Sequence, residues 1–479
     1  MRIWAWGANS NAQLGLGFDS EQESVPTEVK FALSQYHNEL LRNGVLNLSP
    51  RAICGGAYHT LCLVIVSQAK DSETETEAEP ESQENALEDS PPPPPQGGTY
   101  PLEIIKVSDT FEILCFPLVE DQQEHIAAGF NTNFYLFRDG EMKSFGDNNY
   151  NQLGRKISAE EIKQQEKKGR VKKPNYTELW GRLNYEEYAS LNLELPFFAT
   201  ISVGLRHVAA ISLGKDVYIW GDNSKKQTGI YRVTPAGLEE YPTRVEIPTK
   251  IQFPPGFYFT HVACGKDFTI VVHESGCLFG CGQNKYGVLL HAPQDIKEFG
   301  KFSHIFDRLV ADPDIDISDI QCGWRHVVVL FTDGKVISWG RNNFGQLGRP
   351  SINPDFDVEP GFVNFPERVI SIKCGSEHNL ALTITGKVYA WGWNEHDNCG
   401  VKISSKRAEE VEEPQTMETS GRVGVKVEEK AAHSSSSSSF APLPKKKDCI
   451  LVPTLVQFPE NVPISVIGCG SGSSFAISL

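Results

Sequence analysis

Residues 339–348 read Trp-Gly-Arg-Asn-Asn-Phe-Gly-Gln-Leu-Gly, and this phrase decides the fold because the chain repeats it. The other copies begin at Trp6, Phe145, Trp220, Cys281 and Trp391. All of them keep the Gly and Asn of the opening, and all but the copy at Cys281 keep the closing Gly. Self-similarity at a period of roughly 40 to 60 residues is typical of stacked supersecondary units. The chain is therefore predicted to be an array of repeats.

A second phrase, a small residue followed by Gly, two variable residues and His, alternates with the first. Its copies run from Gly56 to His59, Gly129 to Thr132, Gly204 to His207, Gly265 to Phe268, Gly323 to His326, Gly375 to His378 and Gly470 to Ser473. This phrase therefore indicates seven units, whereas the Trp-Gly phrase appears six times. The missing copy is expected between the first two units, with residues 102–108 as the candidate for its strand.

Each unit is predicted to be built from short β-strands. Two β-rich runs in residues 320–340 flank Asp333-Gly334, and an Asp-Gly pair between such runs is a strong hairpin signal. The chain opens inside one phrase and ends inside the other. Residues 2–6 are thus expected to complete the unit formed by residues 464–479, which closes the ring and hides its edge strands.

Composition limits the class of protein. The formal charge of −16 over 479 residues argues against nucleic-acid binding, which needs a basic face. Eleven cysteines is an odd number, and Cys264, Cys322, Cys374 and Cys469 occupy one slot of successive repeats, which favours packing over disulfides. The sequence shows no apolar signal segment and no membrane-spanning run. We expect a reducing intracellular location, in the cytoplasm and nucleus.

Three insertions are predicted to interrupt a single propeller body of residues 1–479. Residues 67–100 are acidic and proline-rich, and residues 403–448 are charged and serine-rich, so both have compositions typical of disorder. Residues 156–190 instead predict a charged helix at 159–168 followed by an aromatic segment.

The recurring polar residues favour structural roles. The histidine slot also accepts Thr132, Phe268 and Ser473, so each imidazole is expected to bond backbone within its own blade. Cys277 and Cys281 lack a second ligand pair at zinc spacing. No phosphate loop or hydrolase motif is present, and Gly468 to Gly472 precede a strand where a phosphate loop precedes a helix. We expect no metal, cofactor or catalytic site, although side chains converging at a central channel remain an enzymatic alternative.

Five residues are candidates for partner binding. Trp324 and Trp393 occupy variable positions of their phrases, beside Arg325 and before Glu395-His396. Exposed aromatic and Arg side chains in turns are common interface anchors. The alternative is that each turn tryptophan folds onto a neighbouring blade.

These motifs resemble the regulator of chromosome condensation repeat family, whose members are all-β, seven-bladed β-propellers. Residues 374–379 and 391–400 look like one branch of it, which holds the fungal alpha-tubulin suppressor, or killer-toxin-insensitivity, protein and the animal secretion-regulating guanine nucleotide exchange factor.

The resemblance implies two functions. The fungal likeness implies a non-catalytic adaptor that binds a small CSL-type zinc or iron protein of diphthamide biosynthesis and supports Elongator-dependent modification of tRNA wobble uridines. The competing class is a guanine nucleotide exchange factor for a small GTPase, which in this family inserts a projecting wedge. Residues 156–190 are the only segment expected to be ordered enough for a wedge, and they show no match to one.

Overall fold

The structure is a computed structural model, and it describes residues 1–18, 20–31, 46–68, 103–108, 111–117, 125–137, 140–167, 175–183, 196–401 and 448–479. The fold and its contacts are given for these residues. Nearly all of the two predicted low-complexity insertions, 67–100 and 403–448, lies outside them.

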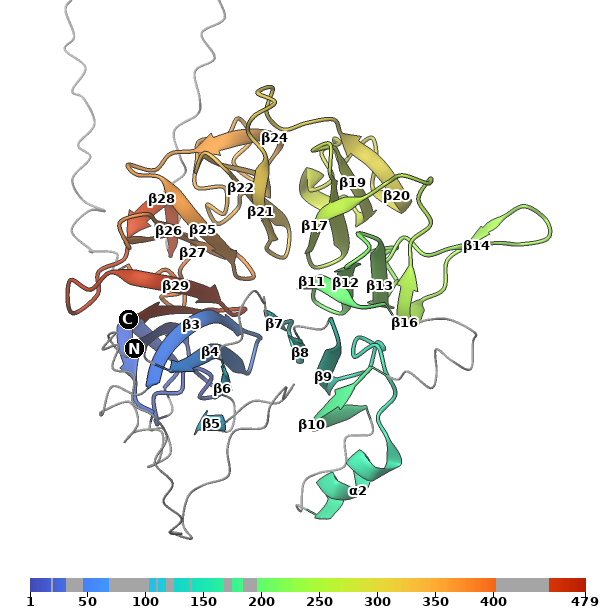
Figure 1. The fold of residues 1–479 in the computed structure, drawn as a ribbon. Helices are drawn as coiled ribbons and strands as arrows, with labels where there is room; N and C mark the ends of the chain where they lie inside the picture. Colours follow the sequence, from blue (N-terminus) through green and yellow to red (C-terminus); the bar gives the residue numbers. More distant parts are fainter. Residues whose placement is uncertain are drawn as a thin grey trace, which may run out of the picture.

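Strands of the described residues form seven four-stranded sheets arranged around a centre (Figure 1). Each sheet is one blade. From the innermost to the outermost strand, the blades are β3 (Leu46–Gly55), β4 (Thr60–Gln68), β6 (Phe111–Pro117), β5 (Glu103–Ser108); β7 (His125–Ala128), β8 (Thr132–Leu136), β9 (Met142–Asp147), β10 (Tyr176–Arg182); β11 (Phe198–Val203), β12 (His207–Ser212), β13 (Val217–Asp222), β16 (Arg244–Lys250); β17 (Phe259–Cys264), β18 (Phe268–His273), β19 (Leu278–Gln283), β20 (Glu298–Phe306); β21 (Ile317–Cys322), β22 (His326–Phe331), β23 (Val336–Arg341), β24 (Phe356–Val363); β25 (Val369–Cys374), β26 (His378–Thr383), β27 (Val388–Trp393), β28 (Cys449–Leu455); and β29 (Ile464–Cys469), β30 (Ser473–Ser478), β1 (Arg2–Ala8), β2 (Gln22–Val29).

The two ends of the chain share the last blade, which confirms the predicted ring closure. Strand β1 pairs with β30 in antiparallel register, from Arg2 opposite Ser478 to Gly7 opposite Ser473. Trp4 and Trp6 on β1 are buried, at 3% and 0% exposure. The N and C labels accordingly lie together in Figure 1.

The second and third strands of a regular blade form the predicted central hairpin. Strands β22 and β23 pair directly around Asp333-Gly334, and Gly334 takes a φ of 87°. All six residues of β22 and the first five of β23 are buried. The hairpin therefore forms the middle of the blade, with apolar side chains covered on both sides.

The blade containing β3 departs from this pattern. Strand β6 fills the third position and runs parallel to β4, and β5 lies at its outer edge. Residues 103–108 thus form the outer strand. The expectation that residues 102–108 replace the missing Trp-Gly copy is wrong, because Phe111 to Pro117 take that place.

Among the described residues, a helix, a 3₁₀ turn and a two-stranded hairpin lie outside the seven sheets. Helix α2 (Ala159–Lys167) begins at a capping box, in which Ser158 Oγ accepts from Glu161 N at 3.2 Å and Glu161 Oε2 accepts from Ser158 N at 2.8 Å. A short 3₁₀ turn, η1, spans Lys285–Gly287. Strands β14 (Arg232–Val233) and β15 (Glu239–Glu240) form a hairpin that projects from the ring (Figure 1). None of the described helices is both long and apolar enough to cross a membrane.

At five positions the Trp-Gly phrase joins a blade to its neighbour. Trp391 Nε1 donates to the carbonyl oxygen of Gln346, in the closing phrase of the preceding blade, at 2.9 Å. Gly348 lies under the same indole, and a Cβ there would meet its ring at 2.7 Å. The indole-to-carbonyl bond recurs at 2.9–3.0 Å for Trp6 and Asn398, Trp220 and Gln152, and Trp339 and Val288. Cys281 keeps the bond with a thiol, which donates to Gln227 O at 3.2 Å.

The Gly-x-x-His phrase supplies a second joint. His326 Nε2 lies 2.7 Å from Asn379 Oδ1 on the next blade, and Asn379 Nδ2 donates to Gln346 O at 3.0 Å. Because the amide group of Asn379 is oriented by that bond, Nε2 is the protonated nitrogen of His326. Equivalent contacts join His207 to Thr269 at 2.9 Å and His378 to Ser474 at 3.0 Å. His207, His326 and His378 therefore contact side chains of the next blade, and not backbone of their own blade as expected.

We predict that removing residues 2–6 opens the ring. The deletion exposes both β30 and β2 as edges and removes two buried tryptophans, so the melting temperature and the solubility of the chain should fall sharply. Removing Leu479, which is 76% exposed, is the control and should change neither. An unchanged melting temperature after removal of residues 2–6 contradicts the shared blade.

We also predict acid destabilisation through the buried histidines. Burial lowers the pKa of His59, His207 and His326 from 6.5 to about 4, and that of His378 to about 3. The Nδ1 atoms of His207, His326 and His378 are buried and have no hydrogen-bond partner, so a second ring proton has no acceptor. The unfolded chain takes up these protons below pH 6.5 and the folded chain does not, so stability falls as pH drops from 6.5 toward 4.

The expected loss is roughly 2 kcal/mol per histidine by pH 5. It is measured by urea unfolding at pH 7 and pH 5. In His326→Gln, which keeps an amide donor and does not titrate, the loss between the two pH values should be smaller by about one histidine's share. Equal losses in the variant and the natural chain rule out this linkage.

Candidate partner-binding face

Loops between the first and second strands, and loops between the third and fourth strands, lie at the same end of every regular blade, because neighbouring strands alternate in direction. We call this end the loop face. Aromatic and imidazole side chains recur on it, and each keeps part of its surface accessible to solvent. They are the exposed Tyr58 and the half-buried Phe130, Tyr150, Tyr286, Trp324, Phe344, Trp393 and His396.

Trp324 lies at the mouth of the central channel. Its ring is 6.4 Å from that of Phe130, which belongs to a different blade, and Lys266 Nζ is 4.9 Å from its centroid. Its backbone is held on both sides, since Trp324 N donates to Ser376 O at 2.8 Å and Trp324 O accepts from Lys266 N at 3.0 Å. A partly exposed indole is thus fixed in place before any partner arrives.

Arg325 is engaged with the preceding blade. Its Nη2 contacts Asp267 Oδ2 at 3.0 Å and its Nη1 donates to Gln283 Oε1 at 2.8 Å. Only 16% of the side chain is exposed. Arg325 therefore holds two blades in register on the loop face, and it leaves little surface for a partner.

Trp393, Glu395 and His396 form one cluster. Trp393 Nε1 donates to Glu395 Oε2 at 3.1 Å, and the ring of His396 meets that of Trp393 edge-on at 5.3 Å. The indole also lies 6.2 Å from Phe344 of the preceding blade. Both turn tryptophans therefore fold onto neighbouring blades and keep part of their surface exposed, and their role in partner binding stays a prediction.

Arginines alternate with these rings. Arg341 lies 4.8 Å from the ring of Phe344 and 5.3 Å from that of Tyr286, and it forms an ion pair with the buried Glu377 at 2.5 Å. Burial raises the pKa of Glu377, against the opposing effect of Arg341. Arg206 stacks on Tyr150 at 4.4 Å in the same manner. The arginines are thus oriented by aromatic faces.

Sequence reasoning missed Tyr150, Tyr286 and Phe344. A signal was present, because each occupies the sixth position of its Trp-Gly phrase. Trp324 and Trp393 were noticed instead because they are unusual residues at other variable positions. His396 occupies the same sixth position.

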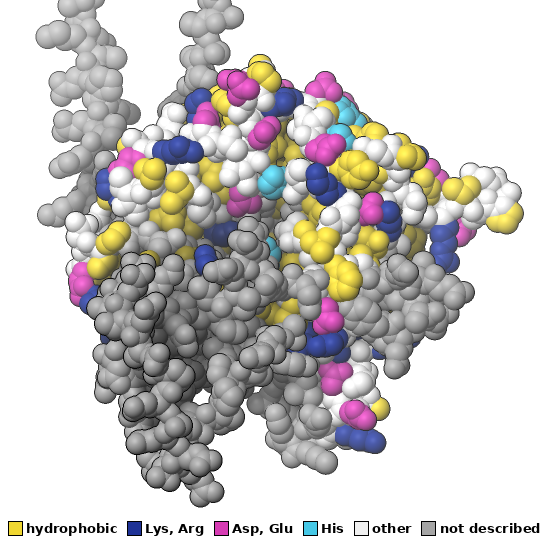
Figure 2. All heavy atoms as spheres, in the orientation of Figure 1, with side chains coloured by type: hydrophobic (Ala, Val, Ile, Leu, Met, Phe, Trp, Pro, Cys, Tyr) yellow, Lys and Arg dark blue, Asp and Glu magenta, His cyan; other side chains and the backbone are white. Residues whose placement is uncertain are grey.

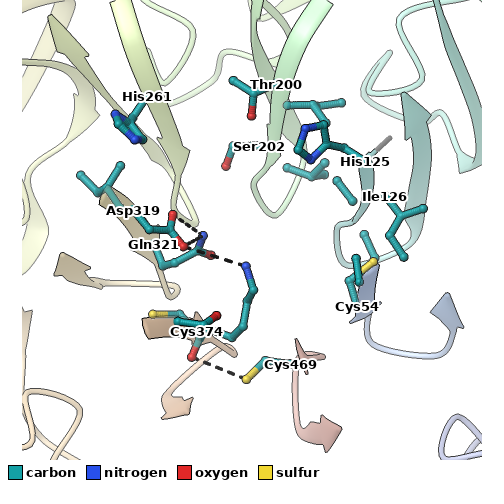
Figure 3. Close-up of a pocket in the computed structure, with 18 of the residues that line it drawn as sticks. Cys54, His125, Ile126, Thr200, Ser202, His261, Asp319, Gln321, Cys374 and Cys469 are labelled. Carbon is teal, nitrogen blue, oxygen red and sulfur yellow. Dashed lines mark hydrogen bonds and ion pairs between the residues drawn. The ribbon is translucent and has the colours of Figure 1, made fainter. Parts of the chain in front are cut away.

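The central channel is a cavity of about 750 Å³ lined by the innermost strands. Figure 3 shows side chains that reach it from separate blades, including His125 from β7, His261 from β17, Asp319 and Gln321 from β21 and Cys374 from β25. Asp319 accepts two bonds from Gln321 and lies 4.0 Å from Lys373. In the same lining, His261 Nδ1 lies 2.9 Å from Thr260 Oγ1, and His261 Nε2 lies 3.3 Å from the carbonyl oxygen of Ser318.

Cysteine thiols line the channel, and they are poor nucleophiles because they stay protonated. Burial raises the pKa of Cys54 and Cys264 to about 12, and it raises the pKa of Cys322, Cys374 and Cys469 above the usual range. Since the thiolate is the nucleophile, protonated thiols of this kind are poor catalysts. They fit the packing role expected for this slot.

Charge is mixed over the surface. In Figure 2, acidic and basic side chains are interspersed around the described part of the ring, with hydrophobic side chains between them. No basic stripe gathers on the described surface in this view. This distribution differs from the electrostatic footprint of a phosphate-binding surface.

Fold and site together define a closed seven-bladed propeller with an aromatic and arginine-rich loop face. The chain belongs to the RCC1-like domain family, whose model matches residues 188–441. Models of the regulator of chromosome condensation repeat also match residues 2–63 and 124–152. The family predicted from the repeat phrases is thereby confirmed.

Two curated relatives give the scale of the likeness. The secretion-regulating guanine nucleotide exchange factor of Mus musculus is 25% identical over 420 residues, which cover 83% of this chain and 75% of the relative. The ultraviolet-B receptor UVR8 of Arabidopsis thaliana is 29% identical over 288 residues, which cover 59% of this chain and 56% of the receptor.

Solved structures support the fold. Yeast RCC1 (Prp20), in a complex with Kap60, matches with a TM-score of 0.61 and 17% identity over 100% of this chain and 89% of that one. Human WBSCR16 matches with a TM-score of 0.59 and 17% identity over the full length of both chains. At this identity the likeness concerns the seven-bladed fold alone.

Proposed function

We propose that the chain is a non-catalytic adaptor that binds a partner protein through its loop face. The observation that carries the proposal is the series of half-buried aromatic rings, stacked with oriented arginines, that recurs around this face. Interface cores are enriched in Trp, Tyr, Phe and Arg and depleted in Lys and Glu.

Rigidity supports the same function. Trp324 is fixed through its backbone, and Trp393 through Glu395 and the ring of His396. Side chains held in their bound geometry lose little conformational entropy on association. We assign the contact to Trp324, Trp393, Glu395 and His396, with Arg325 keeping the blades in register beside them.

The partner we propose is a small CSL-type zinc or iron protein of diphthamide biosynthesis, so that the pair supports diphthamide formation and Elongator-dependent modification of tRNA wobble uridines. The support is the resemblance of residues 374–379 and 391–400 to the fungal branch of the family. Residues 391–400 contain the Trp393 cluster itself.

We predict that Trp393→Ala and Trp324→Ala weaken binding of that partner by about 2 kcal/mol or more each, measured by calorimetry, because a truncated aromatic anchor leaves its pocket unfilled. Phe362→Ala is the matched control, since Phe362 is an exposed aromatic, at 54%, on the outer strand β24. Thermal unfolding should change little in all three. Unaltered affinity in both tryptophan variants places the interface elsewhere.

A second function, guanine nucleotide exchange on a small GTPase, is favoured by one feature. The β14–β15 hairpin projects from the third-to-fourth-strand connection of its blade and carries Val233 and Leu238, which are 63% and 67% exposed. Thr234 and Gly237 close its turn, since Gly237 N donates to Thr234 O at 2.8 Å. This ordered projection was not anticipated from the sequence, where residues 156–190 were the only candidate wedge.

The hairpin separates the two functions experimentally. If the chain is an exchange factor, replacing Val233 and Leu238 by Ser should slow nucleotide release from a GTPase, measured with a fluorescent nucleotide, and leave the CSL-type partner bound. If the chain is an adaptor, no GTPase releases nucleotide faster with the natural chain than without it. Faster release by the natural chain, abolished in the hairpin variant, overturns the adaptor proposal.

A further inference from the structure

A cysteine, a histidine and an aspartate meet on the rim of the sheet formed by β17, β18, β19 and β20. Cys277 lies in the turn before β19, His304 lies near the end of β20, and Asp307 follows that strand directly. One sulfur, one ring nitrogen and one carboxylate oxygen from them are all within 4.8 Å of one another. It is the single group of three such ligands among the described residues.

A local irregularity brings these side chains together. Strands β19 and β20 have two register shifts, whereas every other described strand pair has at most one. The additional shift lies where Leu278 faces Phe306 and Phe279 faces His304, so Ile305 is an inserted residue. A bulge of one residue reverses which face of the strand the next side chains point to, and bulges often re-aim functional side chains.

Neighbouring contacts hold the ligands in place. The ring of His304 meets Phe279 edge-on at 5.5 Å, and its Nε2 lies 3.1 Å from Asp307 Oδ1. Arg308 anchors the segment after Asp307, because its Nη2 donates to Pro313 O and Ile315 O, each at 3.0 Å. The turn that carries Cys277 is closed by the bond from His273 N to Cys277 O at 2.9 Å.

We propose that Cys277, His304 and Asp307 bind a single zinc-class divalent cation, with water as the fourth ligand. Zinc takes thiolate, imidazole and carboxylate ligands, and ligand atoms around tetrahedral zinc are roughly 3.3–3.6 Å apart. The His304 to Asp307 separation of 3.1 Å is already close to that spacing. Binding displaces the thiol proton of Cys277 to solvent, so affinity falls as the pH falls.

The ligand set selects the metal. Thiolate and imidazole favour zinc over magnesium and calcium, which require oxygen ligands. Asp307 is 94% exposed and His304 is 46% exposed, so the site opens to solvent and the fourth position is accessible to water. The spacing of Cys277 and Cys281 suggested no such site, because the two further ligands lie beyond the connection formed by residues 284–297 and Cys281 serves the joint between blades.

The test titrates the chelator-treated, reduced full-length chain with Co²⁺. We expect one equivalent to bind with a thiolate-to-cobalt absorption band in the near ultraviolet, and Zn²⁺ to remove that band by displacement. Cys277→Ser should abolish the band, and His304→Gln and Asp307→Asn should each weaken Co²⁺ affinity at least about tenfold. Cys449→Ser, at another partly buried cysteine, should bind as the natural chain does.

Two further readouts make the result decisive. Zn²⁺ should raise the melting temperature of the natural chain and not that of Asp307→Asn, since a ligand that binds only the folded state stabilises it. Trp393→Ala should keep the metal site, which separates this proposal from the loop-face interface. Absence of the cobalt band, or a band of equal strength in Cys277→Ser, overturns the proposal.

Discussion

Five of the joints between blades depend on one backbone carbonyl each, which accepts a hydrogen bond from the Trp or Cys that opens a repeat phrase. The oxygen of Gln346 accepts from the indole of Trp391 and from the amide of Asn379, which also binds His326. All of these groups are buried, so each donor lost leaves an unpaired polar group in an apolar surrounding. Trp, the closing Gly and His thus recur in the sequence because the same hydrogen-bonded joint recurs in the structure. The repeat phrases consist of the residues that build this joint.

Variation in the phrase is tolerated where the joint survives. Cys281 replaces Trp and still donates to the Gln227 carbonyl, while Thr269 donates to the same oxygen at 2.8 Å. The loop face differs, because its ring-bearing positions vary from blade to blade, with Tyr150, Tyr286, Phe344 and His396 in equivalent places. A constant interior therefore supports a variable surface, which is how one fold can present different binding faces.

The repeat phrases were sufficient to predict seven blades, the Asp-Gly hairpin and the shared terminal blade. They could not predict the parallel strand β6, because its position follows from pairing with β4 across residues distant in the sequence. The partners of the histidines were missed for the same reason, since Asn379 and Ser474 belong to the next blade. At the loop face, residue types indicated Trp324 and Trp393 as candidate partner-binding residues. Only the structure shows that the guanidinium of Arg325 forms an ion pair with Asp267.

The blade made from both ends of the chain also sets an order of events during synthesis. Strand β1 is made before the other six blades, and its partner β30 is made after them, more than 460 residues later. Until then Trp4 and Trp6 have no blade to enter and the β1 edge is unpaired. The nascent chain therefore carries an apolar strand without its β30 partner while the other six blades are made, a state in which chaperones bind and aggregation begins.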